Sequence, residues 1–193
     1  MKNLKFVLLI NLLLSGLIYA QESTFKLFEK SEKQSGFGAV TFNMYNGKYF
    51  MFGGEGAAVF NNFYFGGFGE SGSLGNYTYP FGSIAYELKR SSGGIMLGGM
   101  SNGSQFFAVF TDLKLSWDSY QASSGDASLG LGTFQYRSFS FLPAIGLAIR
   151  PISWLQVRLG GGYRFSGLVD DGGLENVPYN GANINFQLTF GGF

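Results

Sequence analysis

The amino-acid sequence predicts an all-β protein: a single antiparallel transmembrane β-barrel, with eight strands favoured and ten possible. Three observations predict it. Charged residues make up only 13% of the 193 residues and aromatic residues 18%, whereas an average protein has about 25% charged residues. No window after residue 20 is continuously apolar, so we expect no spanning helix. Several segments alternate apolar and polar residues, as strands do between one dry and one wet face.

Residues 1–20 have the layout of a secretory signal peptide. Two lysines precede an apolar run at 6–14, and small residues follow up to Ala20. The run is shorter than the roughly 20 apolar residues of a spanning helix. We therefore expect cleavage after Ala20, which leaves one barrel domain over residues 21–193. An uncleaved N-terminal anchor is the alternative.

Two segments near the C-terminus show the alternation best. In residues 182–190 every even residue is apolar and every odd residue is polar. In residues 155–165 one face carries an apolar row and the opposite face carries Arg158 and Arg164. The row consists of Leu155, Val157, Leu159, Tyr163 and Phe165. Charges in the middle of a strand, opposite large apolar residues, indicate a barrel with lipid outside and a polar interior.

The remaining strands are expected where the alternation is weaker. In residues 83–89 we place Leu88 in the outer row and Glu87 on the inner face. The segment 63–69 is ambiguous, because aromatic residues fall on both of its faces. The other expected strands are at residues 40–44, 49–60, 107–117 and 139–149.

The breaks between strands favour eight of them. Tight breaks are expected at 61–62, 89–92 and 150–153, and long loops rich in Gly, Ser, Asp and Asn at 71–80, 119–133 and 167–180. With both chain ends in the periplasm, every long loop is external, as in small outer-membrane barrels. One further short turn, Asn46-Gly47-Lys48, also falls outside.

Ten strands are the alternative, because residues 93–118 are too long for one spanning strand of about 9–11 residues. Residues 101–104 (SNGS) have turn composition. A hairpin there would require one more strand, which residues 24–30 could supply.

The C-terminal sequence NINFQLTFGGF resembles the closing strand of outer-membrane barrels. In those proteins the final aromatic residue is read by the barrel-assembly machinery, which implies this role for Phe193. Phe193 is out of phase with the apolar row that contains Phe190, unless Gly191 and Gly192 form a bulge.

Most of the mature chain resembles a family of small outer-membrane β-barrels of Bacteroidota (OmpA/OmpX-type barrels). The segments that resemble it are SGFGAVTFNMYNGKYFMFGGEGAAVFNNFYFGGFGE, FLPAIGLAIRPISWLQVRLGGGYRFSG and the closing strand. The resemblance implies the fold, the outer membrane of a Gram-negative bacterium, and outer-membrane lipid and the assembly machinery as partners. It implies no catalytic or binding residue.

A cluster of charged side chains is expected inside the barrel. The interior of an eight-stranded barrel is just wide enough for side chains, and an unpaired buried charge costs several kcal/mol. We therefore predict a packed ion-pair network that plugs the lumen; a gated polar pore or a proton-linked site is the alternative. The residues assigned to the interior are Glu55, Glu70, Glu87, Asp112, Lys114, Arg158 and Arg164.

The composition argues against catalysis and cofactor binding. Histidine and cysteine are both absent, so a serine nucleophile would lack its usual base and a metal would have oxygen ligands only. Asp170-Asp171-Gly172 could contact calcium, but an ordinary turn is favoured. The glycine runs lack the following helix and the lysine of a phosphate loop. A net charge of +1 gives no reason to expect nucleic acid as a partner.

The sequence therefore predicts a structural or surface-interaction role without cofactor or metal, and leaves the surface ligand open. Two alternatives remain. The first is transport of a small or apolar molecule through the barrel. The second is a soluble periplasmic β-sandwich, in which the apolar rows would pack between two sheets.

Overall fold

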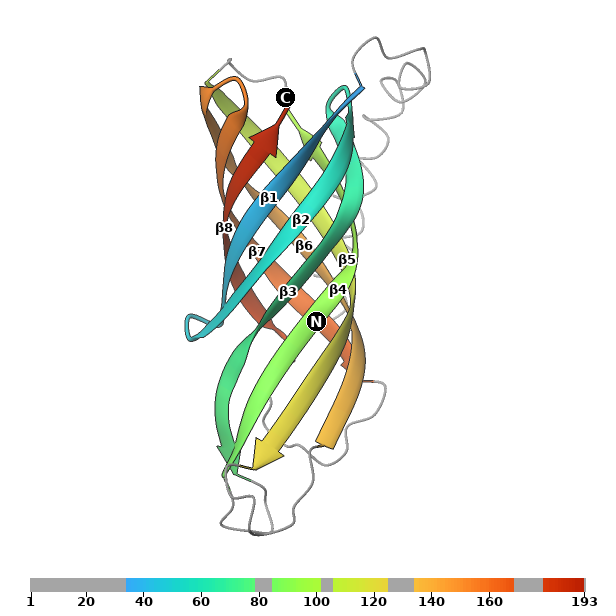
Figure 1. Cartoon of the computed structure of the whole chain (residues 1–193), viewed down its shortest axis with the longest axis vertical. Helices are drawn as coiled ribbons and strands as arrows, with labels where there is room; N and C mark the ends of the chain where they lie inside the picture. Colours follow the sequence, from blue (N-terminus) through green and yellow to red (C-terminus); the bar gives the residue numbers. More distant parts are fainter. Residues whose placement is uncertain (1–33, 79–84, 102–105, 125–133, 169–178, 193) are drawn as a thin grey trace, which may run out of the picture. The chain divides into compact units, whose positions relative to one another are not determined.

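The chain folds into a closed antiparallel barrel of eight strands (Figure 1). The computed structural model describes residues 34–78, 85–101, 106–124, 134–168 and 179–192. The strands are β1 (Gln34–Tyr45), β2 (Tyr49–Phe60), β3 (Phe63–Thr78), β4 (Ala85–Met100), β5 (Phe107–Ser124), β6 (Phe134–Ile152), β7 (Leu155–Leu168) and β8 (Gly181–Gly191).

Each strand pairs with the next one along the chain, and β8 closes the barrel on β1, from Phe37 opposite Gly191 to Tyr45 opposite Asn183. This closure confirms eight strands. The ten-strand alternative is wrong because β1 and β8 pair directly and leave no position between them. The β-sandwich alternative is wrong because the strands form one closed sheet. The expected signal peptide and the segment 24–30 lie outside the described residues.

Strand β8 shows why these residues form a barrel wall. Its odd-numbered residues from 181 to 189 are buried and its even-numbered residues face outward, as the alternation predicts. Strand β7 follows the same rule, with Leu159 59% exposed and Arg158 fully buried. The ambiguous segment in β3 is also resolved, since Phe63 and Phe65 face outward and Tyr64 is buried.

The expected tight break at 89–92 is wrong. These residues lie within β4, where Arg90 and Ser92 point inward. The connection from β4 to β5 comes after Met100, where Ser101 donates its backbone N–H to Val109 and accepts one from it through its side chain. The turn expected at 101–104 is therefore the ordinary β4–β5 connection and adds no strand. Residues 102–105 lie outside the described part.

The barrel has two different ends. We call "loop end" the end with the β1–β2, β3–β4, β5–β6 and β7–β8 connections, and "turn end" the end with the other three (Figure 1). The turn after β1 has left-handed backbone at Asn46 (φ 52°) and Gly47 (φ 68°), as in a tight hairpin turn. Asn61, in the turn after β2, has φ 56°.

The expected long loops are shorter than predicted. Strand β3 continues to Thr78, β5 to Ser124 and β7 to Leu168, so the first part of each expected loop is strand. The backbone ladder does not require apolar side chains, so polar, glycine-rich sequence can extend a strand beyond the membrane. The remaining residues, 79–84, 125–133 and 169–178, lie outside the described part.

The outer surface carries a continuous belt of large apolar side chains. On β5 the belt runs from Phe107 to Trp117, which are 54% and 64% exposed. Ten residue steps at about 3.3 Å and a tilt of about 40° give a height of about 25 Å, the height of the apolar band of outer-membrane barrels. No helix in the described ranges is long and apolar enough to cross a bilayer. Apolar residues outside and polar residues inside make this a membrane-spanning barrel.

Candidate functional site: the charged interior and its apolar cap

The described interior contains equal numbers of buried acidic and basic side chains, so its formal charge is zero. None of them is more than 7% exposed. The strands place them on inward positions of the alternating pattern. They are the carboxylates Glu55, Glu70, Asp112 and Asp118 and the cations Arg90, Lys114, Arg158 and Arg164.

Glu55 and Lys114 form a direct ion pair across the lumen. The Lys114 Nζ lies 2.6 Å from Glu55 Oε2, and the two side chains are 6% and 0% exposed. Lys114 Nζ also lies 5.0 Å from the centre of the Phe68 ring, which shields the pair from one side. The second Glu55 oxygen has no hydrogen-bond partner among the described residues.

Closer to the loop end, Glu70 holds two arginines. Arg90 donates to Glu70 at 3.0 Å, and Arg164 lies 3.8 Å from the same oxygen. Asn43 and Tyr45 donate further hydrogen bonds to Glu70 at 2.7 and 2.8 Å. The Tyr45 ring stacks on Arg90 at 4.0 Å. Both oxygens of the Glu70 carboxylate therefore accept hydrogen bonds.

Arg164, which contacts Glu70 through one guanidinium nitrogen, forms a direct ion pair with Asp118 through the other. Three hydroxyls also donate to its carboxylate: Ser140 at 2.7 Å, and Ser116 and Ser138 at 3.2 Å. A carboxylate that accepts this many hydrogen bonds is stabilised in its charged form. The cluster links β5, β6 and β7.

Asp112 and Arg158 have no ion-pair partner within 4 Å among the described residues, and Tyr64 joins them. Its hydroxyl donates to Asp112, and Arg158 lies 3.5 Å from the same hydroxyl. The guanidinium also packs 4.6 Å from the Phe37 ring and donates to Gln156 at 2.6 Å. Gly98 makes room for the Tyr64 ring, since a Cβ at this position would overlap the ring.

One residue assigned to the interior was placed wrongly. Glu87 lies on the outer face of β4, where its side chain is 45% exposed and forms a 3.6 Å ion pair with Lys89. Leu88, assigned to the outer row, is buried. The inner and outer faces were exchanged here because this part of β4 extends past the belt, where Glu87 faces out and Leu88 faces in.

Sequence reasoning also missed partners of the cluster. Arg90 lies in the segment 89–92 that the sequence predicts to be a tight break, and Asp118 is not among the residues that the sequence assigns to the interior. Tyr64 lies in the ambiguous aromatic segment. The one usable signal was its opposite phase to Phe63 and Phe65.

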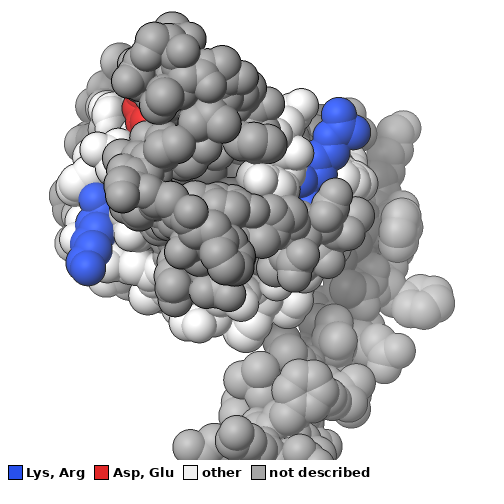
Figure 2. Space-filling view, turned by 90° about the horizontal axis from the view of Figure 1, so that it is seen from below, with Lys and Arg blue, Asp and Glu red and all other residues white. Residues whose placement is uncertain are grey.

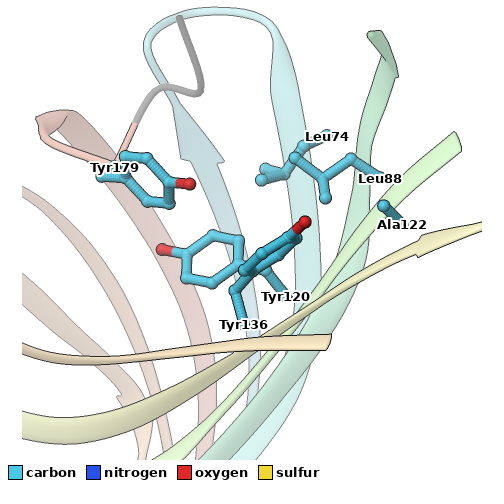
Figure 3. Close-up of a cluster of buried hydrophobic side chains, with 6 residues drawn as sticks. All are labelled: Leu74, Leu88, Tyr120, Ala122, Tyr136 and Tyr179. Carbon is cyan, nitrogen blue, oxygen red and sulfur yellow. The ribbon is translucent and has the colours of Figure 1, made fainter. Parts of the chain in front are cut away.

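An apolar cluster, which we call the tyrosine cap, lies inside the barrel near its loop end. The tyrosine rings of β5, β6 and the segment just before β8 gather in one cluster with Leu74, Leu88 and Ala122 (Figure 3). Tyr120 and Tyr179 make an edge-to-face contact at 5.0 Å, and Tyr49 packs against the cluster from β2. The buried members are Leu74, Leu88, Tyr120, Ala122, Tyr136 and Tyr179.

Among the described residues seen from the loop end, basic side chains reach the surface at two separate places and acidic surface shows at a third (Figure 2). The described residues contain no group of three acidic side chains that could hold a metal ion. The expected turn at 170–172 and Phe193 lie outside the described residues.

The comparisons with known proteins concern the fold. No protein-family model matches the chain, and a search of curated proteins finds no match. Among solved structures, Neisserial surface protein A is similar at a TM-score of 0.49 and 13% identity, over 82% of this chain and 92% of that one. Ail, the attachment invasion locus protein of Yersinia pestis, is similar at a TM-score of 0.46 and 13% identity, over 82% and 95%. A second Ail structure, in complex with the heparin analogue sucrose octasulfate, gives the same values.

Proposed function

We propose that this protein is a non-conducting outer-membrane barrel of a Gram-negative bacterium that presents its extended strands at the cell surface. In this proposal residues 1–20 are a signal peptide, residues 21–193 form the barrel domain, and Phe193 is read by the barrel-assembly machinery. The loop end faces outside. The proposal includes membership of the small-barrel family of Bacteroidota and assigns the chain no catalytic activity.

The filled lumen is the observation that carries the proposal. Arg164 bridges Glu70 and Asp118, and Lys114 pairs with Glu55. The tyrosine cap fills the lumen on the loop-end side of these pairs. Ions would have to break buried pairs in order to pass. The interior therefore supports a closed barrel rather than a pore.

The extension of the wall supports a role outside the membrane. Strands β3 to β6 are 16 to 19 residues long, whereas about 9–11 residues cross a bilayer. The outward residues on the loop-end side of the belt are polar. On β5, Ser119 and Gln121 lie beyond Trp117; on the antiparallel β6, Arg137 and Gln135 lie beyond Phe139. This surface is suited to contacts with water-exposed partners.

Conductance measurements test the proposal against a transport role. The purified full chain in planar lipid bilayers is expected to give no steady single-channel steps, because ions would have to break the buried pairs around Glu55, Glu70 and Asp118. Insertion is checked in parallel by protection of the barrel from added protease. Steady single-channel steps from the inserted protein would contradict a non-conducting barrel and favour a transport role.

A further inference from the structure

The outer wall of β5 and β6 has a groove at the loop-end edge of the apolar belt. Its volume is about 480 Å³, and its lining residues are Trp117, Asp118, Ser119, Arg137, Ser138 and Phe139. The side chains of Asp118 and Ser138 point into the lumen, so they contribute only backbone to an outside groove. The exposed lining is therefore two aromatic rings on one side and a hydroxyl and a guanidinium on the other.

The register places these four groups in two rows. Trp117 is opposite Phe139, and the next outward row has Ser119 opposite Arg137. The two rings contact edge to face at 5.7 Å. The wall changes from apolar to polar between these rows, so the groove lies at the level where lipid headgroups begin.

The polar row, Ser119 and Arg137, has hydrogen-bond donors that can bind an anion. Arg137 is exposed and has no carboxylate within ion-pair distance among the described residues. Ser119 accepts a hydrogen bond from Gln135 at 2.8 Å, which leaves its own hydroxyl hydrogen free to donate. A guanidinium beside a hydroxyl donor matches the oxygens of a phosphate group.

We propose that this groove binds the phosphate headgroup of an anionic membrane lipid. Arg137 and Ser119 hold the phosphate oxygens, and the acyl chain below them lies against Trp117 and Phe139. The inference rests on the membrane insertion in the proposed function. It adds a lipid class and a position on the wall.

The two tryptophans of the chain allow a direct test. Trp117 lies in the groove and Trp154 lies in the β6–β7 turn at the other end of the barrel. The full-length variant Trp154→Phe, which reports on Trp117 alone, is refolded into phosphatidylcholine vesicles. A small fraction of brominated phosphatidic acid, or the same fraction of brominated phosphatidylcholine, is added as the quencher. Trp117→Phe, which reports on Trp154, is measured in the same way.

We expect Trp117 to prefer phosphatidic acid over phosphatidylcholine by about fivefold, the ratio that corresponds to about 1 kcal/mol for one basic residue at an anionic headgroup. Arg137→Gln should abolish the preference, and Lys48→Gln, an exposed lysine in the β1–β2 turn, should keep it. Trp154 should show no preference.

Equal quenching by both lipids, or a preference that survives Arg137→Gln, would overturn the site but leave membrane insertion intact. If neither lipid quenches either tryptophan, insertion itself fails and the site fails with it.

Discussion

Replacing Lys114 by methionine is expected to destabilise the folded barrel by about 3–5 kcal/mol, because it leaves the buried Glu55 carboxylate without its cation. Both side chains are almost fully buried, and the contact is a direct ion pair at 2.6 Å. Of its two oxygens, Glu55 has only the one bonded to Lys114 satisfied. No other described cation lies within 4 Å of Glu55 to replace Lys114.

The double variant Glu55→Leu with Lys114→Met is the matched control. Removal of both charges leaves no uncompensated ion, and apolar replacement of a buried pair is often neutral or stabilising. Urea unfolding in phospholipid vesicles, followed by tryptophan fluorescence, measures both variants. A single variant that loses less than about 1 kcal/mol would show that water reaches Glu55. A double variant less stable than the single would contradict the paired plug.

The second large effect is expected on the outside of the barrel. Ile145 is 60% exposed, near the middle of the apolar row of β6. An arginine at the bilayer midplane costs about 2–4 kcal/mol in outer-membrane barrels. Ile145→Arg should therefore destabilise the barrel by that amount, although a surface substitution in a water-soluble protein usually changes stability by less than about 0.5 kcal/mol.

Gln121→Arg is the control for this substitution. Gln121 faces outward on β5, beyond Trp117 and the belt, where an arginine costs only about 0–1 kcal/mol. Unfolding free energies in vesicles of both variants and of the unchanged chain give the comparison. Equal effects of the two arginines would mean that Ile145 does not contact hydrocarbon.

The parts of the fold that could be predicted from the sequence are the strands inside the membrane. Lipid outside and a polar interior force the alternation, so β7 and β8 were assigned correctly down to the facing of Leu159 and Arg158. The same constraint identified Glu55, Asp112, Lys114 and Arg164 as inward-facing.

Beyond the membrane this constraint no longer holds. At Glu87 to Ser92 the outer face meets water, while the inner face carries Leu88 in the tyrosine cap and Arg90 in the Glu70 ion pair, so polarity no longer distinguishes inside from outside. Leu88 was therefore placed outside and Arg90 in a turn. The pairing of ions could not be predicted either, because it depends on the barrel register, which brings β3, β4 and β7 together around Glu70.

The most direct test of the account is thiol labelling of two positions on the same face of β5. The chain has no cysteine, so Leu113→Cys and Gln121→Cys each carry one thiol. On intact cells a membrane-impermeant maleimide should label Gln121→Cys and leave Leu113→Cys unmodified, while a lipophilic maleimide should label Leu113→Cys. Similar labelling of both positions by the impermeant reagent would contradict a barrel whose apolar belt lies in the bilayer and whose loop end faces outside.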